Sequence, residues 1–112
     1  MKLSEIVKTL NLEVFSNEHL LEDIEVVGAY TSDLLSDVMG KAQEMQIWIT
    51  LQNHKNVLAV ASLKDLAAIL LINNIKPNTE LVEQSEKEEI PILGTKEPAF
   101  IISGKLYNLF YK

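Results

Sequence analysis

A short polar segment, Gln52-Asn53-His54-Lys55, lies between two strongly apolar stretches of the chain. His54 and Lys55 could together favour an anion, because both side chains can carry a positive charge. Polar residues are also the ordinary way in which the ends of strands are connected, so the segment has a plain structural explanation as well. We therefore treat it as a candidate binding site and keep the structural alternative open.

Catalytic chemistry would need patterns that this chain lacks. None of its four glycines begins a G-x-x-x-x-G-K-[ST] phosphate loop, so we expect no kinase activity. His19 and His54 do not have the H-x-x-x-H or H-E-x-x-H spacing of a zinc site. The chain contains no cysteine, which excludes disulfides, thiolate metal sites and thiol nucleophiles.

Two weaker constellations could also suggest catalysis. Asp33 and Asp37 are one helical turn apart, as in a metal-binding or acid–base pair, but a solvated helix face explains them as well. His54 with Ser32 or Ser62 would supply a base and a nucleophile, although nothing in the sequence brings them together. We expect a protein that is not an enzyme, needs no cofactor and holds no metal.

The length and charge of the chain limit its class. Its 112 residues, of which 47% are hydrophobic, are typical of one core, and we expect a single domain over residues 1–112. The net charge is −6 and all ten basic residues are lysines, so no nucleic acid partner is expected. The longest apolar run, residues 66–72, is too short to span a bilayer. We expect a cytoplasmic protein with no membrane partner.

Hydrophobic spacing divides the chain into alternating helices and strands. Helical segments are predicted over 3–10, 17–21, a stretch beginning near Ser32, a stretch after Asn56, 79–88 and 98–110; strands are predicted over 12–15, 24–30, 47–51, 68–72 and 90–93. Ser32 and Asn56 are expected to cap the helices that follow them, with Asp33 in the first helical turn.

This alternation predicts an α/β fold: one domain with a mostly parallel sheet, open to mixed pairing at an edge, and helices on both faces. In such sheets, ligands bind beyond the carboxyl ends of the strands. The candidate ligand-binding residues at that edge are Ser32, Asp33, Gln52, Asn53, His54, Lys55, Asn73, Asn74 and Thr95. Asp33 would oppose an anion there unless it caps a helix or pairs locally.

Three segments carry a resemblance to a known family. Residues 2–14, KLSEIVKTLNLEV, and 24–39, IEVVGAYTSDLLSDVM, resemble the opening of DRTGG-domain proteins and of the N-terminal domain of bacterial HPr kinase/phosphorylase. Residues 48–78, WITLQNHKNVLAVASLKDLAAILLINNIKPN, are similar to the DRTGG core. In this comparison His54-Lys55 stand in place of the Asp-Arg pair, and residues 72–74 in place of the Thr-Gly-Gly turn. The motif that gives the family its name is therefore absent.

The resemblance implies a DRTGG fold and a stand-alone, non-catalytic regulatory domain. Such a domain would bind a small nucleotide-like or phosphorylated ligand at the carboxyl edge of the sheet. The alternative is a homodimerisation or protein-interaction module without a ligand. Its partners would be a second copy or a separate catalytic or signalling protein. The aromatic residues Tyr107, Phe110 and Tyr111 are the candidate interface, with internal packing of the tail as the other explanation.

Overall fold

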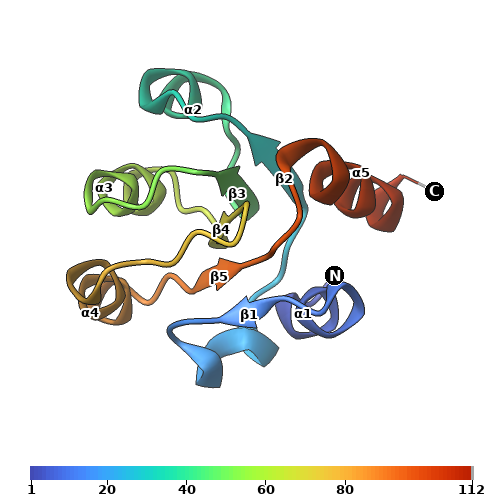
Figure 1. Cartoon of the computed structure of the whole chain (residues 1–112), viewed down its shortest axis with the longest axis horizontal. Helices are drawn as coiled ribbons and strands as arrows, with labels where there is room; N and C mark the ends of the chain where they lie inside the picture. The colour runs from blue at the N-terminus through green and yellow to red at the C-terminus, as the bar shows by residue number, and fades with distance from the viewer. Residues whose placement is uncertain (112) are drawn as a thin grey trace.

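In the computed structural model, which describes residues 1–111, four parallel strands form the centre of the molecule (Figure 1). They are β2 (Gly28–Thr31), β3 (Gln46–Thr50), β4 (Ala68–Leu71) and β5 (Ile92–Gly94), and β1 (Glu13–Val14) pairs antiparallel with β5. The strand order across this five-stranded sheet is β1-β5-β4-β3-β2. The predicted α/β class, with a mostly parallel sheet and one mixed edge, is confirmed.

The inner strands β3, β4 and β5 are buried on both faces of the sheet. Alternate residues of a strand point to opposite faces. In β3, Ile47 and Ile49 belong to one hydrophobic cluster, whereas Trp48 belongs to the other. In β4, Leu70 and Ile69 divide in the same way, and all four residues of the strand are buried. This is why the strands have nearly continuous apolar sequences.

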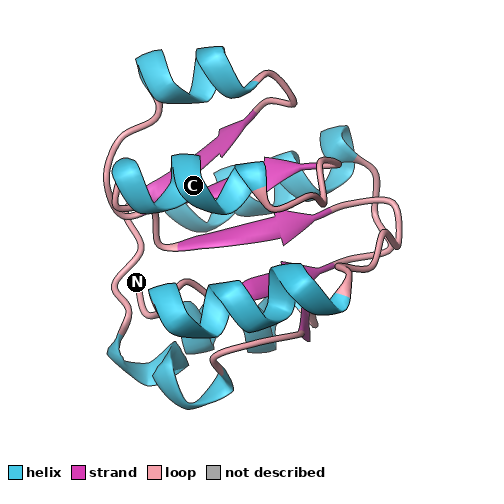
Figure 2. Ribbon diagram, turned by 90° about the vertical axis from the view of Figure 1, so that its left-hand side faces the viewer, coloured by secondary structure: helices cyan, strands magenta, loops and turns pink. Residues whose placement is uncertain are grey.

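The helices form a layer on each face. α2 (Leu35–Lys41), α3 (Asn56–Leu63) and α4 (Thr79–Glu88) each connect consecutive parallel strands and lie together on one face (Figures 1 and 2). They share this face because right-handed crossovers that advance in one direction all turn to the same side. α1 (Leu3–Leu10) and α5 (Ala99–Phe110) cover the other face, and the 3₁₀ helix η1 (Glu18–Asp23) follows β1. The predicted helices over 3–10 and 79–88 coincide with α1 and α4.

The predicted caps of α2 and α3 are wrong. α2 begins at Leu35, because Leu34 before it is extended, and the Ser32 carbonyl is held by a hydrogen bond from Trp48 Nε1 at 2.7 Å. Asp33 therefore lies outside the helix. α3 begins at Asn56 itself, with Lys55 before it and no side-chain cap.

The predicted strand over 24–30 is too long at its start. Leu3 N donates to Ile24 O at 2.9 Å, and Val26 N donates to Met1 O at 2.8 Å. These bonds hold the first part of the segment against the N-terminal residues. The strand joins the sheet only from Gly28.

A buried polar cluster ties the segment after β1 to α4 and β5. The Ser16 and Ser85 hydroxyls are hydrogen-bonded at 2.7 Å, and Ile92 N donates to Ser16 Oγ at 3.0 Å. Asn17 Nδ2 donates to Ser85 O at 2.9 Å. Ser16, Asn17 and Ser85 are all buried, so each of these polar groups depends on its partner.

We predict that Ser16→Ala lowers the free energy of unfolding by about 1–3 kcal/mol, because it leaves the buried Ile92 N–H without an acceptor. Urea denaturation would measure the loss. The control is Ser62→Ala, whose hydroxyl donates to the exposed Glu88 carboxylate at 2.9 Å and should cost less than about 0.5 kcal/mol. Equal losses in the two variants would contradict the role of the buried cluster.

Candidate functional site

The carboxyl ends of β2, β3, β4 and β5 lie at one edge of the sheet, because these strands are parallel. Figure 2 shows their arrowheads on the same side of the molecule. The predicted ligand-binding residues follow these ends in four loops, and we call them the rim: Ser32, Asp33, Gln52, Asn53, His54, Lys55, Asn73, Asn74 and Thr95. The expectation that the loops meet at one edge is met by the geometry, while ligand binding itself stays a prediction.

Asp33 joins the loop after β2 to the end of β3. Its Oδ1 atom accepts hydrogen bonds from the Thr50 hydroxyl at 2.8 Å and from Leu51 N at 2.9 Å. The carboxylate is thus paired locally, as it would have to be if an anion is to bind nearby. Through Oδ1, it holds the loop after β2 against the end of β3.

Gln52 and His54 form the next part of the rim. Gln52 Nε2 donates to Asp33 O at 3.0 Å, which turns the Gln52 amide oxygen toward His54 Nε2, also at 3.0 Å. A carbonyl oxygen is an acceptor, so His54 Nε2 is the donor. The exposed imidazole of His54 is thus held through its Nε2 atom, and its Nδ1 atom lies on the opposite side of the ring. Lys55 Nζ lies 3.3 Å from the Glu80 carboxylate, and both side chains are largely exposed.

The loops after β4 and β5 are bound to each other. Asn73 and Asn74 have φ angles of 57° and 60°, a left-handed conformation that asparagine tolerates better than most residues. Asn73 N donates to Glu97 O at 3.0 Å, and Asn74 N donates to Thr95 O at 2.8 Å. One loop leads to α4 and the other to α5 on the opposite face, an arrangement that often opens a ligand crevice. Here the backbone bonds close that gap.

The rim has a cavity at its β5 end. This cavity, of about 330 Å³, is lined by Asn11, Glu13, Thr95, Lys96, Glu97 and Lys105. Among the predicted site residues, it includes Thr95. Asn53 lies apart from it and donates from Nδ2 to Lys76 O at 3.0 Å, which ties the loops after β3 and β4 together.

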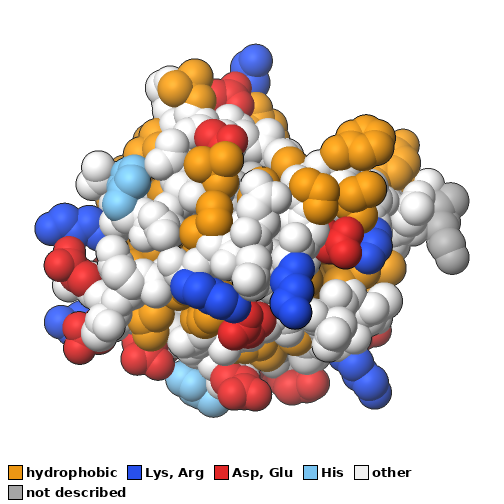
Figure 3. All heavy atoms as spheres, viewed as in Figure 1, with side chains coloured by type: hydrophobic (Ala, Val, Ile, Leu, Met, Phe, Trp, Pro, Cys, Tyr) orange, Lys and Arg blue, Asp and Glu red, His pale blue; other side chains and the backbone are white. Residues whose placement is uncertain are grey.

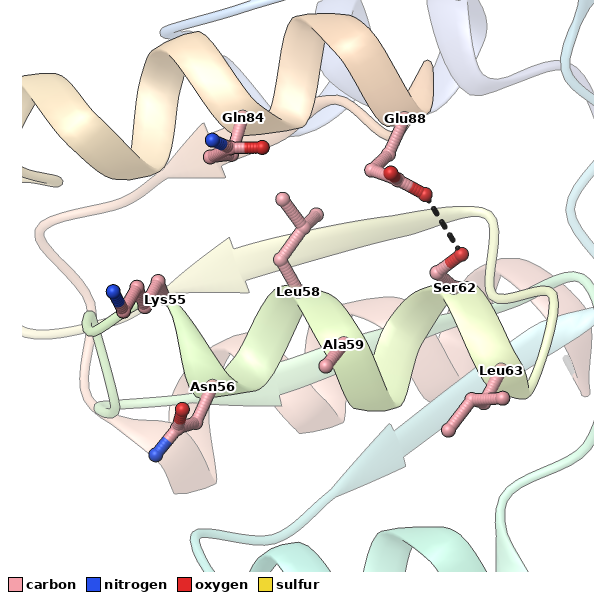
Figure 4. A pocket seen from close by; sticks show the side chains of 8 residues that line it. All are labelled: Lys55, Asn56, Leu58, Ala59, Ser62, Leu63, Gln84 and Glu88. Carbon is pink, nitrogen blue, oxygen red and sulfur yellow. Dashed lines mark hydrogen bonds between the residues drawn. The ribbon is translucent and has the colours of Figure 1, made fainter.

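A second cavity, which the sequence did not predict, lies between α3 and α4. It has a volume of about 380 Å³, and Leu58, Ala59 and Leu63 supply its apolar wall (Figure 4). Lys55 lies at one end, and the hydrogen-bonded pair Ser62 and Glu88 lies at the other. The sequence predicted a helix after Asn56, but local spacing does not show how that helix packs against α4, so it gave no sign of the groove.

The two aspartates that the sequence paired have separate roles. The Tyr30 hydroxyl donates to Asp37 Oδ2 at 2.8 Å, whereas Asp33 bonds to the end of β3. The hydrogen bond from Tyr30 is the main cause that lowers the pKa of Asp37, and the same bond raises the pKa of Tyr30. Within residues 1–111, no three His, Asp or Glu side chains gather closely enough to hold a metal ion.

Comparison with known proteins shows a shared fold. No protein family model matches the sequence, and no curated protein matches it. A similar solved structure is that of the CBS and DRTGG domains of the regulatory region of Clostridium perfringens pyrophosphatase, complexed with the activator diadenosine tetraphosphate. The TM-score is 0.67 at 20% identity, and the match covers 94% of this chain and 45% of that one. The chain thus shares the fold of part of that neighbour and spans less than half of its length. In the part of the chain that the structure describes, no helix has the length and apolar character needed to cross a bilayer.

We predict that Asp33→Ala lowers the free energy of unfolding by about 1–2 kcal/mol, because two donors at the end of β3 lose their acceptor. Amide hydrogen exchange at Leu51 should become faster. Asp33→Asn is the matched control, since its amide oxygen can still accept both bonds but without the negative charge, and it should fall between the wild type and Asp33→Ala. Unchanged exchange at Leu51 would show that Asp33 does not hold this loop.

We predict that Tyr30→Phe raises the pKa of Asp37 toward its ordinary value, which NMR titration would measure. A carboxyl whose pKa is lowered by folding stabilises the protein above its unfolded pKa, and this contribution is lost as the pH falls through the folded pKa. The stability difference between wild type and variant should therefore be present at neutral pH and shrink in acid, below about pH 4. A difference that stays constant down to acid pH would contradict the Tyr30–Asp37 hydrogen bond.

Proposed function

We propose that the chain is a regulatory domain without catalytic activity of its own, and that it binds a small phosphorylated ligand at the rim. The observation that carries the proposal is the convergence of four loops on one edge, with His54 and Lys55 beside the amino end of α3. The amino end of a helix favours negative charge, and an imidazole and an ammonium group add to that preference.

The distribution of lysines supports an anionic ligand. In a chain of net charge −6, the loops after β3, β4 and β5 each contain a lysine, namely Lys55, Lys76 and Lys96. Lys55 pairs with Glu80 at 3.3 Å and Lys76 with Glu13 at 2.7 Å, in side chains that are at least half exposed. Exposed ion pairs of this kind are weak. A phosphate group, with its greater charge, can therefore compete for these lysines.

The fold of the chain supports a nucleotide-like ligand. The pyrophosphatase regulatory region that shares the fold is complexed with diadenosine tetraphosphate, which is both a nucleotide and a polyphosphate. We propose that this chain is a regulatory domain of the DRTGG type. The resemblance to the N-terminal domain of HPr kinase/phosphorylase stays a prediction.

A second candidate function is self-association. It is favoured by a separate observation, the exposed aromatic side chains of α5, among which Phe100 is 87% exposed. This function requires no ligand and uses a different surface from the rim.

We predict that a panel of adenine and guanine nucleotides and phosphorylated metabolites includes a compound that raises the melting temperature. A ligand at about 100 times its dissociation constant stabilises the folded state by roughly 2.7 kcal/mol, which thermal denaturation detects readily. His54→Ala should abolish the rise, because the imidazole belongs to the proposed site.

His19→Ala is the matched control, since His19 is exposed on η1, away from the rim, and its removal should leave the rise intact. A panel that produces no shift would count against ligand binding. Turnover of ATP or transfer of a phosphoryl group by the purified chain would contradict the non-catalytic part of the proposal.

A further inference from the structure

The outer side of α5 exposes a row of aromatic residues. Phe100 is 87% exposed, Tyr107 61% and Tyr111 64%, and Ile101 beside them is 40% exposed. Phe100, Gly104 and Tyr107 are spaced by three or four residues, so they lie along one side of α5. Tyr111, just beyond the helix, continues this row and donates from its backbone N to Tyr107 O at 2.9 Å. Figure 3 shows hydrophobic side chains gathered over α5. We call these residues, with Ile101, the α5 face.

Gly104 lies in the middle of the α5 face. Its φ angle is not positive, and a Cβ atom at this position would meet no atom within 4 Å, so neither its conformation nor its packing requires glycine. Glycine in the middle of a helix makes the folded protein less stable than alanine would at the same position. A missing side chain does allow another helix to approach closely. A hollow of about 480 Å³ lies over Gly104, between Phe100, Ile101, Tyr107 and Asn108.

The charge of the α5 face suits a second copy of the chain. Two copies with a net charge of −6 repel each other, and a face without carboxylates adds least to that repulsion. α5 contains no Asp or Glu, and Lys105, its one lysine, lies 3.8 Å from Glu97. The face is therefore apolar and nearly neutral, and it can meet an identical face without repulsion between like charges.

The exposed area is of the size that self-association needs. With about 200 Å² for each aromatic side chain, the three aromatic residues of the α5 face expose on the order of 400 Å². A standard interface takes about 800 Å² from each partner. The remainder is available from Ile101, Asn108 and the adjoining groove of about 180 Å³ between α5 and β2, which Ala29 and Thr31 line.

We infer that the protein forms a two-fold symmetric dimer in which α5 of one copy packs across α5 of the other at Gly104. In an antiparallel crossing centred on Gly104, Phe100 of one copy lies four residues before the crossing point. It meets Tyr107 of the second copy, which lies three residues after that point. Such a contact is self-complementary, as a two-fold interface requires. The inference rests on the second candidate function, self-association, and is independent of ligand binding, because it concerns a different surface.

The structure also changes which residues are expected in the interface. Of the three predicted from the sequence, Tyr107 and Tyr111 are exposed, whereas Phe110 is half-buried and packs against the core cluster that contains Ile102 and Leu106. A substitution at Phe110 would therefore disturb the fold as well as an interface. Phe100, which the sequence did not single out, is the cleaner probe.

Sedimentation equilibrium of the full chain tests the inference. The wild type should approach twice the monomer mass of 12.6 kDa with rising concentration. Phe100→Asp should raise the dissociation constant by roughly tenfold or more, because an unpaired charge would be buried. The new carboxylate would lie in the first turn of α5, where negative charge is favourable, so the monomer should stay folded by circular dichroism. A wild type that remains monomeric up to about 1 mM would overturn the inference.

Leu63→Asp is the matched control, because Leu63 is 73% exposed and lies on α3, across the sheet from α5. It should leave the dimer intact, and a loss as large as that of Phe100→Asp would overturn the assignment to α5. Gly104→Leu tests the crossing point. It fits within one copy and should weaken the dimer, whereas tighter association would show that the helices do not meet at Gly104. His54→Ala should leave the dimer unchanged, which separates this result from the test of ligand binding.

Discussion

The parallel direction of β2, β3, β4 and β5 is the constraint on which the rest of the structure depends. It requires a crossover after each of β2, β3 and β4, and those crossovers contain α2, α3 and α4 on one face. It also buries the strands on both sides, which explains why Trp48 and Ile49, neighbours in sequence, belong to different clusters. The rim is a consequence of this arrangement. Its polar residues meet because the strands end together, and their mutual hydrogen bonds then set the shape of the loops.

The rim and the α5 face differ in chemistry but share a connection. The rim is polar and includes Lys55, with Lys76 and Lys96 in the same loops, whereas the α5 face is apolar and lacks carboxylates. The segment from Thr95 to Pro98 belongs to both regions, because it leaves β5 at the rim and leads directly into α5. Thr95 Oγ1 accepts from Glu97 N at 3.2 Å, and Glu97 O accepts from Asn73 N, so this short segment is bound to the neighbouring loop. If the proposed ligand displaced a rim loop, this segment would carry the change to the start of α5 and so link the proposed binding to the proposed dimer.

Much of the fold could be predicted from the sequence, because the spacing of apolar residues indicates which side chains are buried. The amphipathic spacing of 3–10 and the apolar run of β4 are of this kind, and both were located correctly. The errors arose where tertiary contacts override local preference. Ser32 has the character of a helix cap, yet its carbonyl is held by Trp48 Nε1, so the helix begins later. The loops of the rim could be predicted to meet, but the exposure of Phe100 and the groove beside Leu58 depend on how helices pack, which local spacing does not specify.

The pairing of β1 with β5 bears on how the chain folds as it is synthesised. The Ser16 hydroxyl that receives the Ile92 N–H is 76 residues away along the chain, and Asn17 reaches an acceptor on α4. A growing polypeptide that has left the ribosome only as far as β4 therefore has no partner for its first strand. Contacts between such distant residues slow folding and keep partly made chains exposed to aggregation. The antiparallel edge can form only after β5 has emerged, and α5 follows it, so the domain becomes complete only when its final third has emerged.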